Sequence, residues 1–171
     1  MAEKEISDDQ SRRARYARGK ILRKASPRER HGDFAGAHAR DPVAILAESD
    51  SGRIAKLLPV RYARMTQSPF AFLRGAATVM AADLAGEPMA GVDVQGCGDC
   101  HIMNFGAFAS PEHNILFDIN DFDETLPGPW EWDLKRLAAS IVVAAQHVRL
   151  SESEAHRLAN TAARAYREKM A

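Results

Sequence analysis

One stretch of the chain combines residue types that could transfer a proton and bind a metal. Asp99 is followed five residues later by Asn104, and Asp121 and Asp123 come after a further apolar segment. Between residues 93 and 133 the chain holds nine carboxylates and no Lys or Arg. Clustered carboxylates raise one another's pKa unless a cation neutralises them, and carboxylate and amide oxygens are the hard ligands that Mg²⁺ prefers. The stretch therefore predicts a magnesium site, with an acidic surface loop as the alternative.

The spacing of these residues is typical of kinase-type phosphoryl transfer. In that reaction one Asp accepts the proton of the substrate hydroxyl, and an Asn on the same loop holds a metal. A second Asp, at the end of a following strand, holds the metal on the phosphates. The base must lie near the acceptor and the metal ligands near the phosphates, all on one rigid hairpin. The order Asp99, Asn104 and then Asp121 meets this requirement, and the acidic run adds Asp123 as a further metal ligand.

The same loop also matches three other motifs. Cys97, Cys100 and His101 form a C-x-x-C-H haem pattern, and the two cysteines alone form a C-x-x-C redox pattern. Haem attachment requires export, and the N-terminus has neither the basic nor the apolar region of a secretory signal. A redox pair belongs at a helix start after a strand, whereas more strand is expected here. Zinc bound through both cysteines, His101 and His113 stays open, although the second paired motif of such sites is missing.

Composition limits the function classes. The chain has 171 residues with 46% hydrophobic content, which suits one domain with a core. Its net charge is zero, so we expect no nucleic-acid partner and no membrane surface, and no apolar run reaches the length of a membrane span. We therefore expect a cytoplasmic protein with reduced cysteines. Residues 1–18 are expected to be a disordered or basic helical leader, and 19–171 a single domain.

Local signals predict helices on both sides of a small strand set, which is an α+β arrangement and not a βαβ one. Helices are expected at 12–24, after Ser26-Pro27, after Asp41-Pro42, at 54–65 with a break near Pro59, from 68 to about 86, at 130–148, and after a capping box at Ser151. Short strands are expected at 92–95, 105–108 and 114–119, and a turn at 126–129.

Three segments resemble the catalytic region of aminoglycoside phosphotransferases and choline-kinase-like enzymes. Residues 98–104 are similar to their G-D-x-H-x-x-N loop, 119–122 to their I-D-F segment, and 128–134 to their G-D-P-x-x-D-L-A segment. The resemblance implies part of a protein-kinase-like C-lobe that uses Mg²⁺ and ATP or another nucleotide. It makes Asp99 the catalytic base and Asn104 and Asp121 metal ligands. It also makes Asp133 a structural residue that braces the loop.

Longer runs resemble a bacterial family named domain of unknown function 2252. They are RYARM at 61–65, SPFAFLRGAA at 68–77, VQGCGD at 94–99, NFGAFASPE at 104–112, FDINDFDET at 117–125 and PWEWDLKRLAAS at 129–140. Cys100 stands where that family leads us to expect a small Ala. Its members are expected to be longer, with a Gly-rich, Lys-bearing nucleotide segment after the catalytic half. By that resemblance 19–171 is a partial kinase-like domain, truncated at its C-terminus and doubtful as an enzyme alone.

The sequence therefore leaves three hypotheses about function. The leading hypothesis is Mg²⁺-dependent phosphoryl transfer from a nucleotide to a small hydroxyl acceptor. The second is a binding or regulatory module of the same fold without catalysis. The third is a metal-dependent phosphoesterase, in which Asp118, Asp121 and Asp123 would hold a metal that activates water.

Overall fold

The computed structural model describes residues 12–33 and 40–170, and it has the predicted α+β composition of helices with two small sheets. In chain order the elements are α1 (Arg12–Ala25), η2 (Arg28–Gly32), α2 (Pro42–Ser49), η4 (Ala55–Leu57), α3 (Leu58–Met65), α4 (Pro69–Gly75), α5 (Ala77–Leu84), β1 (Asp93–Gly96), η5 (Ile102–Asn104), β2 (Phe105–Ala109), β3 (Ile115–Ile119), β4 (Leu126–Pro129), α6 (Trp130–His147) and α7 (Glu152–Lys169).

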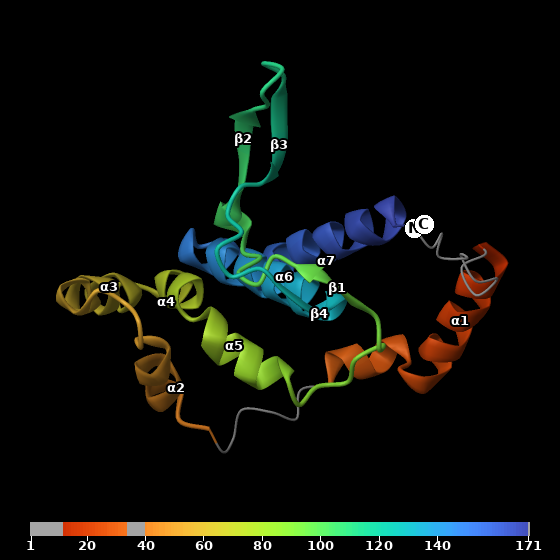
Figure 1. The fold of residues 1–171 in the computed structure, drawn as a ribbon, viewed down its shortest axis with the longest axis horizontal. Coiled ribbons are helices and arrows are strands. Elements are labelled where there is room, and N and C mark those ends of the chain that lie inside the picture. Colours follow the sequence, from red (N-terminus) through yellow and green to blue (C-terminus); the bar gives the residue numbers. More distant parts are fainter. Residues whose placement is uncertain (1–11, 34–39, 171) are drawn as a thin grey trace, which may run out of the picture.

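Two long antiparallel helices, α6 and α7, form the centre of the molecule (Figure 1). Ala155 of α7 is completely buried, because small side chains let the two helices approach closely. The ring of Trp130, at the start of α6, stacks on that of Tyr166, near the end of α7, with 5.7 Å between centroids. The predicted capping box is confirmed: Ser151 accepts a bond from the Glu154 backbone, and the Glu154 carboxylate accepts one from Ser151 N.

The helices α2 to α5 pack around a small apolar cluster beside α6. Its buried members are Leu46, Met65, Ala76 and Val79. The single helix predicted from 68 to about 86 is wrong, because the chain breaks at Ala76, which has φ −122° and ψ 38°. Two arginines explain the break: Arg61 donates to the Gly75 carbonyl (2.7 Å) and Arg136 to the Leu73 carbonyl (2.8 Å). Both carbonyls thus find partners outside the helix.

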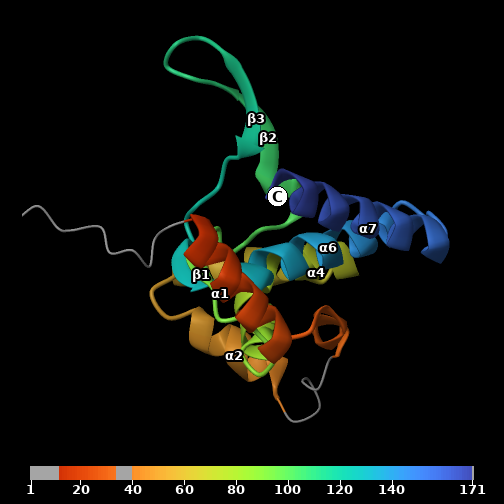
Figure 2. The same ribbon diagram turned by 90° about the vertical axis from the view of Figure 1, so that its right-hand side faces the viewer.

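The strands form two separate antiparallel pairs, β1 with β4 and β2 with β3. The turn predicted at 126–129 is wrong, since these residues are β4 and pair with β1, with Val94 opposite Gly128. Pro127 and Pro129 lack a backbone N–H, but a two-stranded ribbon has only edges, where proline is tolerated. The β2–β3 hairpin rises away from the helices (Figures 1 and 2).

The N-terminal helix predicted at 12–24 is confirmed as α1. The helix start predicted at Ser26-Pro27 is only a 3₁₀ turn, η2, and Ser26 does not cap it. At Pro59 the break is real, because η4 ends at Leu57 and α3 begins at Leu58. Residues 1–11 of the predicted leader lie outside the described residues. Within 12–33 and 40–170, no helix is both long and apolar enough to cross a membrane.

The close contact of α6 with α7 gives the first prediction. Replacing Ala155 by Leu adds a side chain where no space is open, so we expect a loss of about 1–3 kcal/mol in the free energy of unfolding. Denaturant unfolding measures it. The matched control is His156→Leu, which adds its volume on the exposed side of the same helix turn. Equal stability of the two variants would contradict the packing described here.

Candidate functional site

The predicted catalytic loop, residues 97–104, links β1 to β2 and lies against the first turns of α6. Four of its side chains are buried, those of Cys97, Cys100, His101 and Asn104. Asp99 is partly accessible, with 19% of its side-chain surface exposed. Buried loop backbone must find hydrogen-bond partners, and three amides of this loop find them on side chains of α6.

Asp133 holds the beginning of this loop. Its Oδ2 accepts a hydrogen bond from Cys97 N (2.7 Å) and its Oδ1 accepts one from Gly98 N (3.1 Å). A carboxylate that receives two amide hydrogen bonds fixes the path of the backbone that supplies them. The predicted bracing role of Asp133 therefore agrees with the structure.

Arg136, one helical turn after Asp133, holds the carboxylate of Asp99. Its Nε donates to Asp99 Oδ1 over 2.6 Å, and its Nη2 also contacts that oxygen. The guanidinium is buried and additionally contacts the Leu73 carbonyl and Met80 Sδ. The acidic stretch is thus less unbalanced than its sequence suggests, because a cation just outside it compensates the charge of Asp99.

Ser140 completes the contact between α6 and the loop. This fully buried side chain accepts a bond from Ile102 N (2.9 Å) and donates to the Leu137 carbonyl (2.7 Å). Arg136 and Ser140 are site residues that were not predicted from the sequence. A signal was available: they follow Asp133 at intervals of three and four residues, which places all three on one face of a helix.

Gly98 lets the loop pass close to the acidic turn that follows β3. Its φ is +84°, and a Cβ at this position would overlap the backbone oxygen of Glu124. The pKa of Glu124 is raised, first by desolvation and then by the negative charge of Asp99. The turn that carries the acidic run is therefore packed directly on the loop that carries Asp99.

The structure buries one of the predicted metal ligands, Asn104, and leaves Asp121 and Asp123 exposed, with the backbones of Asn104 and Asp121 both next to the loop. The side-chain Nδ2 of Asn104 donates to the backbone carbonyl of Asp99 (2.9 Å). The backbone carbonyl of Asn104 accepts a hydrogen bond from Asn120 N (3.0 Å). The Asp121 carbonyl accepts a bond from Cys97 Sγ (3.4 Å). Asp123 is exposed, and its N–H points to Asp121 Oδ1 (3.4 Å). Asn104 thus ends the loop, and Asp121 and Asp123 lie together in the turn beside it.

The two cysteines are buried and form no disulfide. Desolvation, followed by the charge of Asp133, raises the pKa of Cys97 to about 11 and that of Cys100 to about 12. A redox or metal-binding cysteine needs its thiolate form. Among the described residues, no three His, Cys, Asp or Glu side chains form a group suited to a metal, and His113 lies in the turn at the far end of the β2–β3 hairpin.

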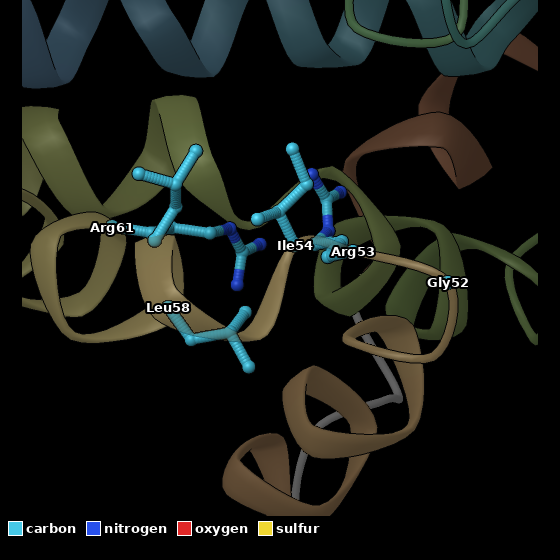
Figure 3. A pocket seen from close by; sticks show the side chains of 6 residues that line it. Gly52, Arg53, Ile54, Leu58 and Arg61 are labelled. Atoms are coloured by element: carbon cyan, nitrogen blue, oxygen red, sulfur yellow. The ribbon is translucent and has the colours of Figure 1, made fainter.

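A shallow pocket lies elsewhere, between the loop before η4 and helix α3 (Figure 3). Arg61 lines it but is already engaged by Asp50 (3.1 Å) and by the Gly75 carbonyl (2.7 Å). Its cation therefore serves to hold the helices, and no residue of the 97–104 loop lines this pocket.

Two glycines give a prediction that separates backbone strain from crowding. Gly52 has almost the same φ as Gly98, +85°, but an added Cβ there meets nothing within 4 Å. Gly52→Ala should cost only the left-handed penalty of roughly 1–2 kcal/mol. Gly98→Ala should cost clearly more and displace the Glu124 turn, as thermal unfolding and amide NMR shifts would show. If both variants lose the same stability, the loop does not pack on that turn.

His101 predicts how stability changes with pH. Burial lowers the pKa of this imidazole below its ordinary value of 6.5, with Arg136 and Arg74 acting in the same direction and Asp99 opposing them. Below about pH 6.5 the unfolded chain binds a proton that the folded chain resists, so the free energy of unfolding falls as pH decreases. Denaturant unfolding between pH 7 and pH 5 should show a shallower decrease for His101→Gln. The exposed His156→Gln is the control, and identical slopes for all three proteins would refute the prediction.

Comparison with known proteins adds one finding. No match was found among the curated proteins, and none among the solved structures. A family profile described as "Uncharacterized protein conserved in bacteria (DUF2252)" matches residues 53–171, which include the 97–104 loop, both sheets and the helices α6 and α7. Because this match covers more than half of the chain, the protein belongs to the DUF2252 family.

Proposed function

We propose that this chain supplies the catalytic segment of a kinase-like phosphotransferase, which moves a phosphoryl group from ATP or another nucleotide to the hydroxyl group of a small molecule. The observation that carries the proposal is the way Asp99 is held. Asp133 fixes the backbone just before it, and Arg136 fixes one oxygen of its carboxylate. A catalytic group held in place before the substrate arrives needs little reorganisation during the reaction.

In this proposal Asp99 Oδ2 accepts the proton of the substrate hydroxyl. The other oxygen, Oδ1, is occupied by Arg136. Oδ2 lies 3.6 Å from His101 Nε2, a distance longer than a hydrogen bond. The lowered pKa of His101 keeps its imidazole neutral near pH 7, so it does not compete with the substrate as a cation. Partial exposure of Asp99 gives the hydroxyl a way to reach it.

The donor set beside Asp99 suits Mg²⁺ by its chemistry. Asn104 and Asp121 offer an amide and a carboxylate oxygen, and the Asn120–Asn104 backbone bond keeps the two residues next to each other. We propose these two residues as ligands, with Asp123 as an outer one. A magnesium ion bound there would neutralise charge on the phosphate groups of the nucleotide.

One observation favours a second function, a binding module without catalysis. The buried Arg136 engages Asp99 Oδ1 through two of its nitrogens. Ion pairs of this kind also occur in loops with a purely structural role. In that case the site would bind a metal–nucleotide complex and leave it unchanged.

Calorimetric titration with Mg²⁺ and ATP tests the binding step. The wild-type chain should bind the complex, and Asp121→Asn should weaken binding at least about tenfold, because it removes a charged metal ligand. Asp118→Asn is the matched control, since Asp118 is exposed on β3 and its carboxylate accepts a bond from its neighbour Ile119. Absence of binding by the wild type, or an equal loss in both variants, would overturn the proposal.

A second measurement separates catalysis from binding. Asp99→Asn should bind Mg²⁺ and ATP as the wild type does but lose the formation of ADP, measured by chromatography in the presence of a mixture of small polyols and amino alcohols. ADP formation that is absent in the wild type, or equal in wild type and Asp99→Asn, would assign the site to the non-catalytic module.

A further inference from the structure

The β2–β3 hairpin presents a continuous apolar face that the described part of the chain does not cover. Its pairing places Phe105 opposite Ile119, Ala107 opposite Phe117 and Ala109 opposite Ile115. Alternate residues of a strand share a face, so these six apolar side chains lie together. Ile115 is 83% exposed and Phe117 is 74% exposed. The small alanines of β2 leave a flat strip beside these two large side chains.

Such a face requires a partner in solution. A two-stranded hairpin is marginally stable by itself, and contiguous exposed apolar patches mark interaction surfaces. Within the described residues, β2 and β3 contact mainly each other. Both views show the hairpin standing clear of the helices (Figures 1 and 2).

The charge around the hairpin restricts what that partner can be. Residues 105–125 contain five carboxylates and no Lys or Arg: Glu112, Asp118, Asp121, Asp123 and Glu124. All five residues are exposed; Asp118 lies on the face of the hairpin opposite Phe117, and the other four lie outside the two strands, at the tip and at the base. A partner that buries the apolar face must therefore be apolar on its contacting side and basic at the rim, since charge complementarity selects partners.

Helix α1 has both properties. It carries seven Lys or Arg and no Asp or Glu, and none of its residues is buried. Ile21 is 67% exposed, and Ala17 and Ala25 lie one turn before and after it on the same face. Arg18 and Lys24 are three residues from Ile21 on either side, so they border this face.

We propose that the chain forms a two-fold dimer, in which α1 of one copy lies on the apolar face of the β2–β3 hairpin of the other. In Figure 1 the hairpin rises from the middle of the molecule, whereas α1 lies at its right-hand end, so the two elements do not meet within one copy. A two-fold axis produces the contact twice, because each copy supplies one basic helix and one acidic hairpin. The inference is independent of the proposed function.

Analytical ultracentrifugation of the full chain over a range of concentrations tests the dimer. The wild type should dimerise, and Phe117→Ser should raise the dissociation constant at least about tenfold because it removes a large apolar side chain from the contact. Ile54→Ser is the matched control, since Ile54 is 60% exposed on another part of the surface. Circular dichroism establishes that each variant is folded. A wild type that stays monomeric, or equal effects of both substitutions, would overturn the proposal.

Charge reversal identifies the two elements that pair. Arg18→Glu/Lys24→Glu places carboxylates on both borders of the α1 face, and Glu112→Lys/Asp123→Lys places cations at the tip and at the base of the hairpin. Each double variant alone should dimerise more weakly than the wild type, because like charges then meet at the border of the contact. An equimolar mixture should associate more strongly than either variant alone, since each substituted border then meets charges of opposite sign. If mixing restores no association, α1 is not the occupant. Binding of a duplex DNA by the wild type that is lost only in the α1 variant, with dimerisation unchanged, would assign α1 to nucleic acid instead.

Discussion

The arrangement of the candidate site depends on one row of polar side chains along the first turns of α6. Asp133, Arg136 and Ser140 share a helix face and bind the backbone before Asp99, its carboxylate, and the backbone after it. A helix is rigid over this distance, so three contacts from it fix the loop in position and orientation. Without them the loop would leave three amides and a carboxylate without these partners in a mostly buried place, which is energetically costly.

Arg136 extends this constraint beyond the loop. Its guanidinium also binds the Leu73 carbonyl at the end of α4 and contacts Met80 of α5. The ion pair with Asp99 is thus tied to the point where these two helices separate. Removing one partner of a buried ion pair typically costs about 3–5 kcal/mol, because the other charge stays buried without compensation. The geometry around Asp99 and the packing of α4 and α5 on α6 are therefore parts of one unit.

The sequence predicted those features that short-range chemistry determines. The capping box at Ser151, the N-cap at Asp41 and the basic helix α1 follow from local hydrogen bonds and periodicity, and the structure has them. The predictions that were wrong concern features that depend on contacts between distant parts of the chain. The break at Ala76 depends on guanidinium groups that come from Arg61 and Arg136, far along the chain.

The same difference between short-range chemistry and long-range contacts decides which site residues were predicted. Asp99, Asn104 and Asp121 could be proposed from their spacing, because the chemistry requires that order of residue types. The brace of Asp133 came from resemblance to known enzymes and agrees with the geometry. Arg136 and Ser140 do not stand out by residue type on a helix; their spacing places them on the helix face of Asp133, and their position against the loop shows their role. Strand β4 was missed because its pairing with β1 depends on residues about 30 positions away.

The base of the β2–β3 hairpin lies next to the candidate site, because Asn104 directly precedes β2 and Asn120 directly follows β3. Asn120 N binds the Asn104 carbonyl, and its side chain lies so close to Gly106 that a Cβ there would come within 2.6 Å of Asn120 Nδ2. The two strands leave from Asn104 and return just before Asp121, so their tilt sets the positions of both residues. A structure that covers the apolar face of β2 and β3 restricts this tilt, because packed elements resist small displacements. In the dimer that we propose, the docked helix would restrict the relative placement of Asn104 and Asp121, although no docked residue needs to touch either of them.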